Sequence, residues 1–196
     1  PHSAIDPVPI AAETVLAIQL GVTRQLNVLD PGLVTFGKLV AGTTHNVIPE
    51  SAHLEGTIRA LSAETREQVH SMVQQVSEHI AQAHGAEATV DFNLGYPVTS
   101  NDEAVTSHVM ATAASLLGEA AVNEMPYPIM GSEDWSYVLQ RVPGVMAFLG
   151  ACPVDLDPET APSNHSNRVV FDEDAMAAGV ALYAAVALTH MDSGPS

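Results

Sequence analysis

The spacing of apolar residues switches between helical and strand periods along the first hundred residues, and this order constrains the fold most. Apolar residues from Ile10 to Leu26 recur every three or four positions, which predicts an amphipathic helix over residues 8–27. Two strands are predicted over 33–41 and 51–60, a second helix between Ser62 and Gly85, and a third strand over 88–94. This order is typical of an α+β layer, one sheet covered by helices on one face. With one more strand in front, it would be a ferredoxin-like split β-α-β unit.

The second half of the chain shows a different pattern after a boundary between Tyr96 and Asp102. Helices are predicted over 103–118, just after the 130–135 loop, and from Asp172 or Asp174 onward, with a buried strand over 145–149. These strands are too few for a doubly wound sheet, so this half is expected to be the C-terminal part of a larger catalytic domain. We therefore expect two domains, residues 1–98 (without their first strand) and 99–196, with the N-terminal half of a longer protein absent.

Composition excludes several classes of partner. Six basic and 23 acidic residues give a net charge of −17, which argues against binding to nucleic acid or to an anionic membrane, since both need a basic footprint. No apolar stretch reaches the roughly 18 residues that span a bilayer. The single cysteine, Cys152, fits a reducing compartment. A soluble, cytoplasmic protein is expected.

A few polar residues could carry chemistry. His165 lies in a polar loop before an acidic helix start, where a neutral imidazole can bind a metal, although most surface histidines bind nothing. Arg59 lies on the polar face of its strand, 13 residues after Asn46. A guanidinium can bind a carboxylate and an amide can bind a carbonyl oxygen. From the residues alone, a surface pair of Arg59 with Glu55 and a turn role for Asn46 are favoured.

Four separated segments change that balance, because together they resemble one family. They are Pro1-His2-Ser3-Ala4-Ile5-Asp6-Pro7; Gly42-Thr43-Thr44-His45-Asn46-Val47-Ile48-Pro49-Glu50 with the Gly56–Leu61 strand; Met130-Gly131-Ser132-Glu133-Asp134-Trp135-Ser136; and Asn164-His165-Ser166-Asn167. In this order they resemble the aminoacylase and carboxypeptidase family of two-metal amidohydrolases, metallopeptidase family twenty. The nearest branch includes hippurate hydrolase, N-acetyl-diaminopimelate deacetylase and the auxin-conjugate hydrolases.

The resemblance implies a lid/dimerisation domain of ferredoxin-like α+β type, a sheet with two helices, followed by the C-terminal segment of an α/β two-metal-peptidase domain. It implies that His165 ligates one of two divalent metals, zinc or manganese. Asn46 would contact the scissile carbonyl and Arg59 the substrate, usually in the neighbouring subunit's active site, hence a homodimer through the lid. The substrate pocket would be lined by Gly131, Ser132 and Glu133, with an acidic helix-start role for Glu133 equally open. His2 would edge the site or serve only in a turn.

The chain also departs from the family pattern. The family's Cys-Gly-His-Asp-x-His segment, its Glu-Glu pair and a further ligand histidine do not occur in this sequence. Trp135 stands where phenylalanine is commoner, and Asn164-His165-Ser166-Asn167 replaces Leu-His-Ser-Pro. We therefore expect an inactive fragment of an enzyme that hydrolyses N-acyl amino acids or similar small carboxylate-bearing amides. The alternative is a non-catalytic module that dimerises or binds an amino-acid-like ligand.

Overall fold

The computed structural model describes residues 1–193, and these divide into two compact units. The first comprises Pro1–Val98 with Pro128–Glu133, and the second comprises Thr99–Tyr127 with the chain from Asp134 onward. No helix within residues 1–193 is long and apolar enough to cross a bilayer.

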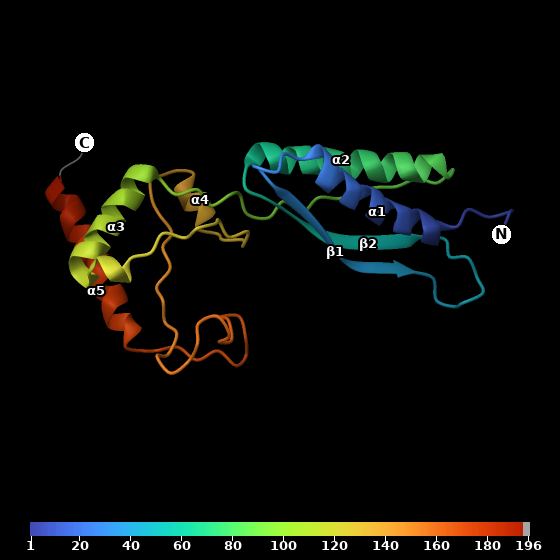
Figure 1. Ribbon diagram of the computed structural model, residues 1–196. Coiled ribbons are helices and arrows are strands. Elements are labelled where there is room, and N and C mark those ends of the chain that lie inside the picture. Colours follow the sequence, from blue (N-terminus) through green and yellow to red (C-terminus); the bar gives the residue numbers. More distant parts are fainter. Residues whose placement is uncertain (194–196) are drawn as a thin grey trace. The chain divides into compact units, whose positions relative to one another are not determined.

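The first unit packs two helices on one face of a two-stranded sheet (Figure 1). Its elements are α1 (Pro7–Gln25), β1 (Gly32–Ala41), β2 (Ala52–Ala60) and α2 (Ala63–Ala83). The strands pair antiparallel from Gly32↔Ala60 to Ala41↔Ala52, with an irregularity between Phe36 and Lys38. This order and these bounds agree with the helix, strand, strand, helix prediction to within a few residues.

Local signals explain where the two helices begin and end. The side chain of Asp6 accepts a hydrogen bond from Val8 N (3.0 Å), and Pro7 occupies the first turn, where no amide donor is needed. Ser62 caps α2 by accepting from Thr65 N (3.0 Å). Gly85 follows α2 with φ +72°, a left-handed conformation that favours glycine after a helix.

The core lies between the helices and the sheet. Its buried centre is formed by Ile18, Val34, Val69, Met72 and Val73. The helices approach closely, because a Cβ on Gly21 of α1 would lie 2.5 Å from the Met72 sulfur of α2. Partly buried residues pack around this centre: Val22, Leu26, Phe36, Ile58, Val76, Val90 and Phe92.

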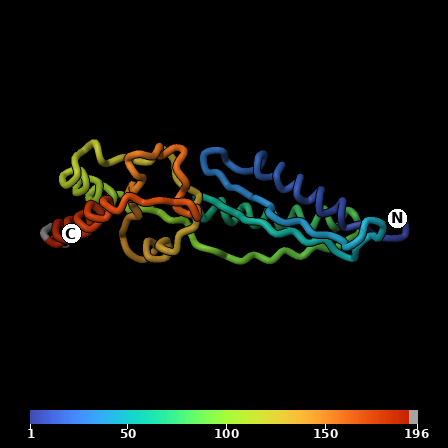
Figure 2. The backbone as a smooth tube through the Cα atoms, turned by 90° about the horizontal axis from the view of Figure 1, so that it is seen from below, coloured from blue at the N-terminus to red at the C-terminus, as the bar shows by residue number. Residues whose placement is uncertain are grey.

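The strand predicted over 88–94 is not present, because no neighbouring strand pairs with this segment in the described part of the chain. The chain is nevertheless extended there and alternates in burial: even-numbered residues from 86 to 92 are partly buried and odd-numbered residues are exposed. Figure 2 shows it running beside β2. The alternating pattern thus predicted correctly which residues of 86–94 are buried and which are exposed. It was wrong that the segment forms a strand, because strand pairing needs a neighbouring strand that the pattern does not encode.

The second unit contains α3 (Glu103–Leu117), the 3₁₀ turn η1 (Glu119–Ala121), α4 (Ser136–Leu139) and α5 (Ala175–Ser193). The helices predicted here are present, and α3 lies against α5, where Thr189 Oγ1 lies 3.1 Å from His108 Nε2. The buried strand predicted over 145–149 is wrong for the described residues. That segment is bonded to a loop residue and not to a strand: Met146 N donates to Asn101 Oδ1 (2.9 Å), and Asn101 Nδ2 donates to Met146 O (3.4 Å). Phe148 is 62% exposed.

Candidate functional site

Arg59 lies near the end of β2 and is held by a distant backbone group. Its Nη1 donates to the carbonyl oxygen of Met130, 71 residues away, and its side chain is half-buried. The bond ties segment 128–133 to the first unit. No residue pattern could reveal this contact, because a backbone carbonyl acceptor leaves no signature in the sequence.

The surface pairing of Arg59 with Glu55, one of the alternatives open at the sequence level, is wrong. Glu55 instead accepts hydrogen bonds from Lys38 Nζ (2.7 Å) and lies 3.0 Å from His53 Nε2. Lys38 is its cross-strand partner on β1, a favourable position for opposite charges. The bonds from Lys38 and then His53 hold the pKa of Glu55 below its ordinary value.

The three predicted pocket residues, Gly131, Ser132 and Glu133, differ in their surroundings. Ser132 lines the same groove as Arg59, so the structure brings these two predicted site residues together. Gly131 is exposed, and nothing lies within 4 Å of the point where a Cβ would stand. Glu133 is half-buried and ends the segment that belongs to the first unit.

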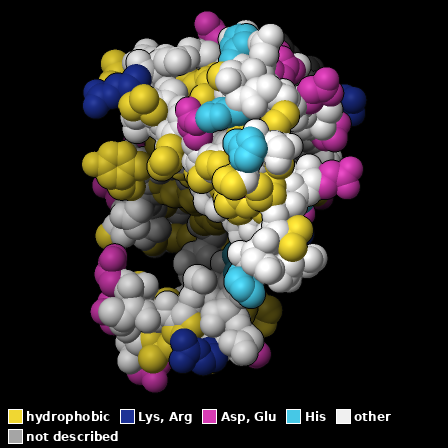
Figure 3. Space-filling view, turned by 90° about the vertical axis from the view of Figure 1, so that its right-hand side faces the viewer, with side chains coloured by type: hydrophobic (Ala, Val, Ile, Leu, Met, Phe, Trp, Pro, Cys, Tyr) yellow, Lys and Arg dark blue, Asp and Glu magenta, His cyan; other side chains and the backbone are white. Residues whose placement is uncertain are grey.

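Asn46 and His2 lie at the opposite end of the first unit. Asn46 is exposed in the β1–β2 loop, and its Oδ1 accepts from Thr44 Oγ1 (3.3 Å). His2 is exposed in a turn closed by Ala4 N to Pro1 O (3.1 Å). Figure 2 shows the chain start and this loop at the same end, and Figure 3, which looks from that side, shows histidine and apolar side chains together there.

Strand length separates the two predicted substrate contacts. Arg59 is seven residues beyond Ala52, which spans about 23 Å at the rise of a β-strand, and the Asn46 loop lies beyond Ala52 (Figure 1). A small amide is far shorter than this. Arg59 and Asn46 of one chain therefore do not contact the same small molecule.

His165 lies exposed in a turn of the second unit. Ser166 N donates to Ser163 O (2.8 Å), and Ser166 Oγ accepts from Arg168 N (3.1 Å), so the turn is bonded on both sides of the imidazole. Downstream, Asp172 Oδ1 accepts from Asp174 N (3.0 Å) just ahead of α5. A histidine on such a pinned loop can offer one nitrogen to a metal.

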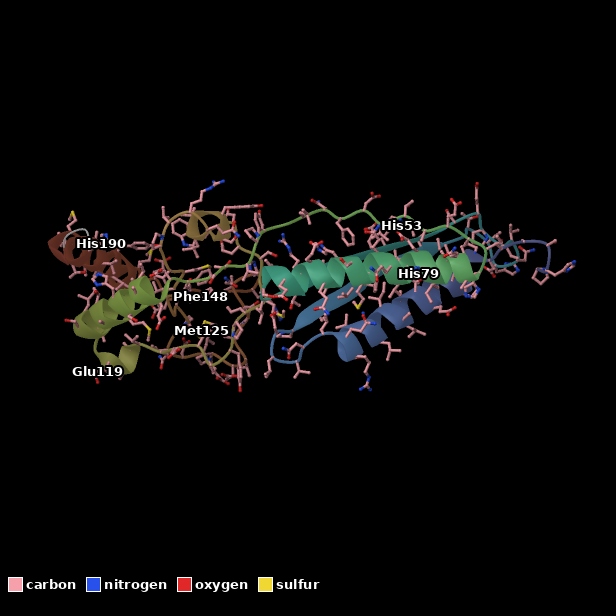
Figure 4. All side chains as sticks on the ribbon, turned by 90° about the horizontal axis from the view of Figure 1, so that it is seen from above. His53, His79, Glu119, Met125, Phe148 and His190 are labelled. Atoms are coloured by element: carbon pink, nitrogen blue, oxygen red, sulfur yellow. The ribbon has the colours of Figure 1, made fainter. Side chains whose placement is uncertain are left out.

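The described residues do not complete a metal site. Within residues 1–193, no group of three or more His, Cys, Asp or Glu side chains lies close enough to hold an ion. Figure 4 shows His53 on β2, His79 on α2 and His190 on α5. His190 stands edge-on to His108 with ring centroids 6.3 Å apart, which makes a pair and not a cluster. A single candidate ligand, His165, does not fit a pair of metals.

One cavity of the first unit was not anticipated from the sequence. A groove of about 1160 Å³ separates β2 from residues 86–96, with side chains of α1 and α2 as its floor. We call it the β2 groove. On its floor, His70 stacks on Phe92 with ring centroids 4.5 Å apart, and burial, then the charge of Arg66, lowers the pKa of His70. A smaller cavity of about 400 Å³ lies beside the β1–β2 loop.

Comparison with known proteins assigns this arrangement to a class of hydrolases. Residues 8–189 match peptidase family M20/M25/M40, and the chain belongs to this family. The resemblance drawn from the four sequence segments is therefore confirmed.

Relatives show which activities occur among similar proteins. The chain is 37% identical over 150 residues to N-acetyl-L-cysteine deacetylase of Bacillus subtilis, covering 76% of this chain and 35% of that protein. It is 32% identical over 195 residues to IAA-amino acid hydrolase ILR1-like 4 of Arabidopsis thaliana, covering 97% and 44%. The crystal structure of the Bacillus subtilis YXEP protein, a dinuclear metal binding peptidase, matches with TM-score 0.79, 25% identity and coverage of 97% and 47%. The chain thus spans less than half the length of these relatives.

Proposed function

We propose that residues 1–196 form part of a longer metal-dependent amidohydrolase that cleaves N-acyl amino acids or similar small amides bearing a carboxylate. The supporting observation is family membership over residues 8–189, together with relatives named as a deacetylase of N-acetyl-L-cysteine and a hydrolase of IAA-amino acids. The first unit would be the lid/dimerisation domain and the second the C-terminal part of the catalytic domain. The enzyme would act in the cytoplasm, to which a single cysteine is suited.

In this proposal, Arg59 recognises the carboxylate of the substrate. Its guanidinium carries five N–H donors, and one of its nitrogens, Nη1, donates to Met130 O. The remaining donors at the wall of the β2 groove can form a bidentate pair with a carboxylate. The bond to Met130 restricts the guanidinium before a ligand arrives, so less side-chain freedom is lost on binding.

The test compares two substrates in the full-length gene product. Arg59→Ala should lower kcat/KM for an N-acetyl amino acid by roughly 10- to 100-fold, the value of a hydrogen bond to a charged group. It should leave kcat/KM unchanged for the same N-acetyl amino acid with its carboxylate replaced by a carboxamide. Arg24→Ala, an exposed arginine in the last turn of α1, is the control and should change neither value. Equal loss on both substrates would show that Arg59 does not read the carboxylate.

The separation of Asn46 from Arg59 supports a homodimer in which each active site takes one of them from each subunit. Asn46 would then donate its amide to the scissile carbonyl in the partner's site. Asn46→Ala and Arg59→Ala subunits, each weakly active alone, should recover activity when mixed, because one site of the mixed dimer has both residues intact. No recovery after verified subunit exchange would reject shared sites.

Metal binding would require ligands beyond the described residues, with His165 as one of them and zinc or manganese as the ion. The coding sequence upstream of Pro1 is the first thing to read. Upstream histidine and acidic ligands, together with about two metal ions per subunit in the purified product, would support the enzyme. A product that dimerises without metal or hydrolysis would instead support the non-catalytic module. Residues 1–196 alone should be inactive.

A further inference from the structure

A pocket lies beside the loop that connects β1 to β2. It has a volume of about 400 Å³, and its lining includes the apolar residues Val40, Val47 and Pro49 and the acidic residue Glu50. We call it the hairpin pocket. Val40 and Val47 are 48% and 60% exposed, so apolar surface at this place is accessible to a ligand.

The hairpin pocket belongs to the face of the sheet that the helices leave uncovered. Ile58 of β2 packs against the core, so His53 and Arg59, at odd-numbered positions of the same strand, lie on the opposite face. Val40 pairs with His53 across the strands, and both residues line the pocket. The pocket and Arg59 therefore occupy the two ends of one face of the sheet.

The order of chemical groups along the proposed substrate indicates the ligand of this pocket. In an N-acyl amino acid, the carboxylate and the acyl chain extend from opposite sides of the scissile C–N bond. In the proposed shared site, Arg59 of one subunit binds the carboxylate, and the other subunit brings Asn46 to the carbonyl. The acyl chain then extends toward the subunit that supplies Asn46. Val47 follows Asn46 directly, with consecutive Cα atoms about 3.8 Å apart, so the pocket is within reach of that chain.

Charge at the pocket limits the kind of acyl chain that it can bind. Glu50 is exposed and belongs to the lining, where its charge repels a chain that ends in a carboxylate. Lys38, a cation two residues before Val40, is already bound to Glu55 (2.7 Å). The apolar part of the lining is instead stabilised when methylene groups cover it. Uncharged apolar chains therefore suit the pocket best.

Resting on the proposed function and its shared site, we propose that the hairpin pocket receives the acyl chain of the substrate. Val47 is then a residue that determines specificity, and the enzyme prefers uncharged apolar chains longer than acetyl. A fully buried methylene contributes about fourfold to affinity. Because Val40 and Val47 are only partly buried, we expect roughly two- to fourfold per methylene in kcat/KM.

The experiment measures kcat/KM of the full-length gene product for the N-acetyl, N-butanoyl and N-hexanoyl derivatives of one amino acid. Over the four methylenes that separate hexanoyl from acetyl, the preference for hexanoyl should reach roughly 15-fold or more. Val47→Asp places a charge in the lining and should reduce this preference to about threefold or less. Val47→Thr keeps the shape of the side chain and should give an intermediate preference. Both variants should cleave the N-acetyl derivative within about threefold of the unmodified enzyme, because one methyl group makes little use of the pocket.

Val28→Asp is the matched control, because Val28 is 84% exposed in the turn before β1 and does not line the hairpin pocket. It makes the same change of charge and should keep the preference for hexanoyl. A second comparison tests the role of Glu50. The N-succinyl derivative should be a poorer substrate than N-butanoyl, and Glu50→Gln should improve it by up to about fivefold without changing N-butanoyl.

An acyl pocket is excluded if the unmodified enzyme shows no preference for longer chains, if both Val47 variants keep the full preference, or if Val28→Asp removes it equally. Circular dichroism reports whether each variant is folded, and Val47→Thr decides the question where Val47→Asp does not fold. Loss of N-acetyl cleavage in folded Val47→Thr would show that Val47 supports Asn46 and not the acyl chain. Hydrolysis with an unchanged chain preference rejects the pocket alone, whereas no hydrolysis of any derivative rejects the proposed function and the pocket with it.

Discussion

Removing the guanidinium of Arg59 should release segment 128–133 from the first unit. The bond from Arg59 to Met130 O is a polar contact between this segment and β2, and it is partly shielded from water. A hydrogen bond from a charged donor contributes about 1.5–3 kcal/mol. Because about 1.4 kcal/mol changes an equilibrium tenfold, Arg59→Ala should raise local opening of 128–133 by roughly 10- to 150-fold.

Hydrogen exchange resolved by peptide measures this opening in residues 1–196. Arg66→Ala is the matched control, because its longer bond to Tyr96 O (3.3 Å) is exposed and should change exchange only near 94–98, by about threefold or less. Arg59→Lys keeps the charge without the planar fork and should give an intermediate rate. Unchanged exchange of 128–133 in Arg59→Ala, or an equal effect from Arg66→Ala, would refute the reasoning.

Two further predictions concern stability. Ile18 of α1 is 1% exposed and Leu16 is 71% exposed. Ile18→Ala should therefore lower the free energy of unfolding by about 2–5 kcal/mol, and Leu16→Ala by under about 0.5 kcal/mol. Urea unfolding followed by far-UV circular dichroism measures both values, and equal losses would contradict the core assignment. Hydrogen bonds from Ser62 and then Thr65 lower the pKa of Asp30, so its stabilising effect is complete above the ordinary value of 3.8 and is lost as pH falls through the lower folded value. Asp30→Asn should flatten the acid dependence of unfolding, and an unaltered slope would argue against this assignment.

Local chemistry in the sequence predicted the helices well. Ser62 and Gly85, taken from the sequence as the limits of the second helix, bracket α2, because caps and turn residues act within a few positions of themselves. The Asp6 cap of α1 was found only in the structure. Apolar periodicity also located β1 and β2, which find each other through a short connection. These features need no distant partner, and a single sequence therefore contains their signal.

The candidate site was less accessible from the sequence. That Arg59 bonds to a carbonyl 71 residues away, and that Asn46 lies about 23 Å or more from it, follow from strand length and chain path. Family resemblance identified which side chains to consider but left their separation open. The β2 groove had no signal of its own, because it is defined by the space between elements.

The two strand predictions that were wrong concern segments that differ in packing. Both segments lack a strand partner within residues 1–193, but only residues 86–94 bury one face, with Val90 and Phe92 packed against the core. In segment 145–149, Phe148 and Leu149 are 62% and 49% exposed, so no packed face supports an extended conformation there. Packing of this face against the core thus accompanies an extended backbone in 86–94 without a strand ladder. Apolar alternation therefore predicts the buried face of a segment more reliably than its pairing, because burial needs only the adjacent helices and a ladder needs a second strand at the right edge.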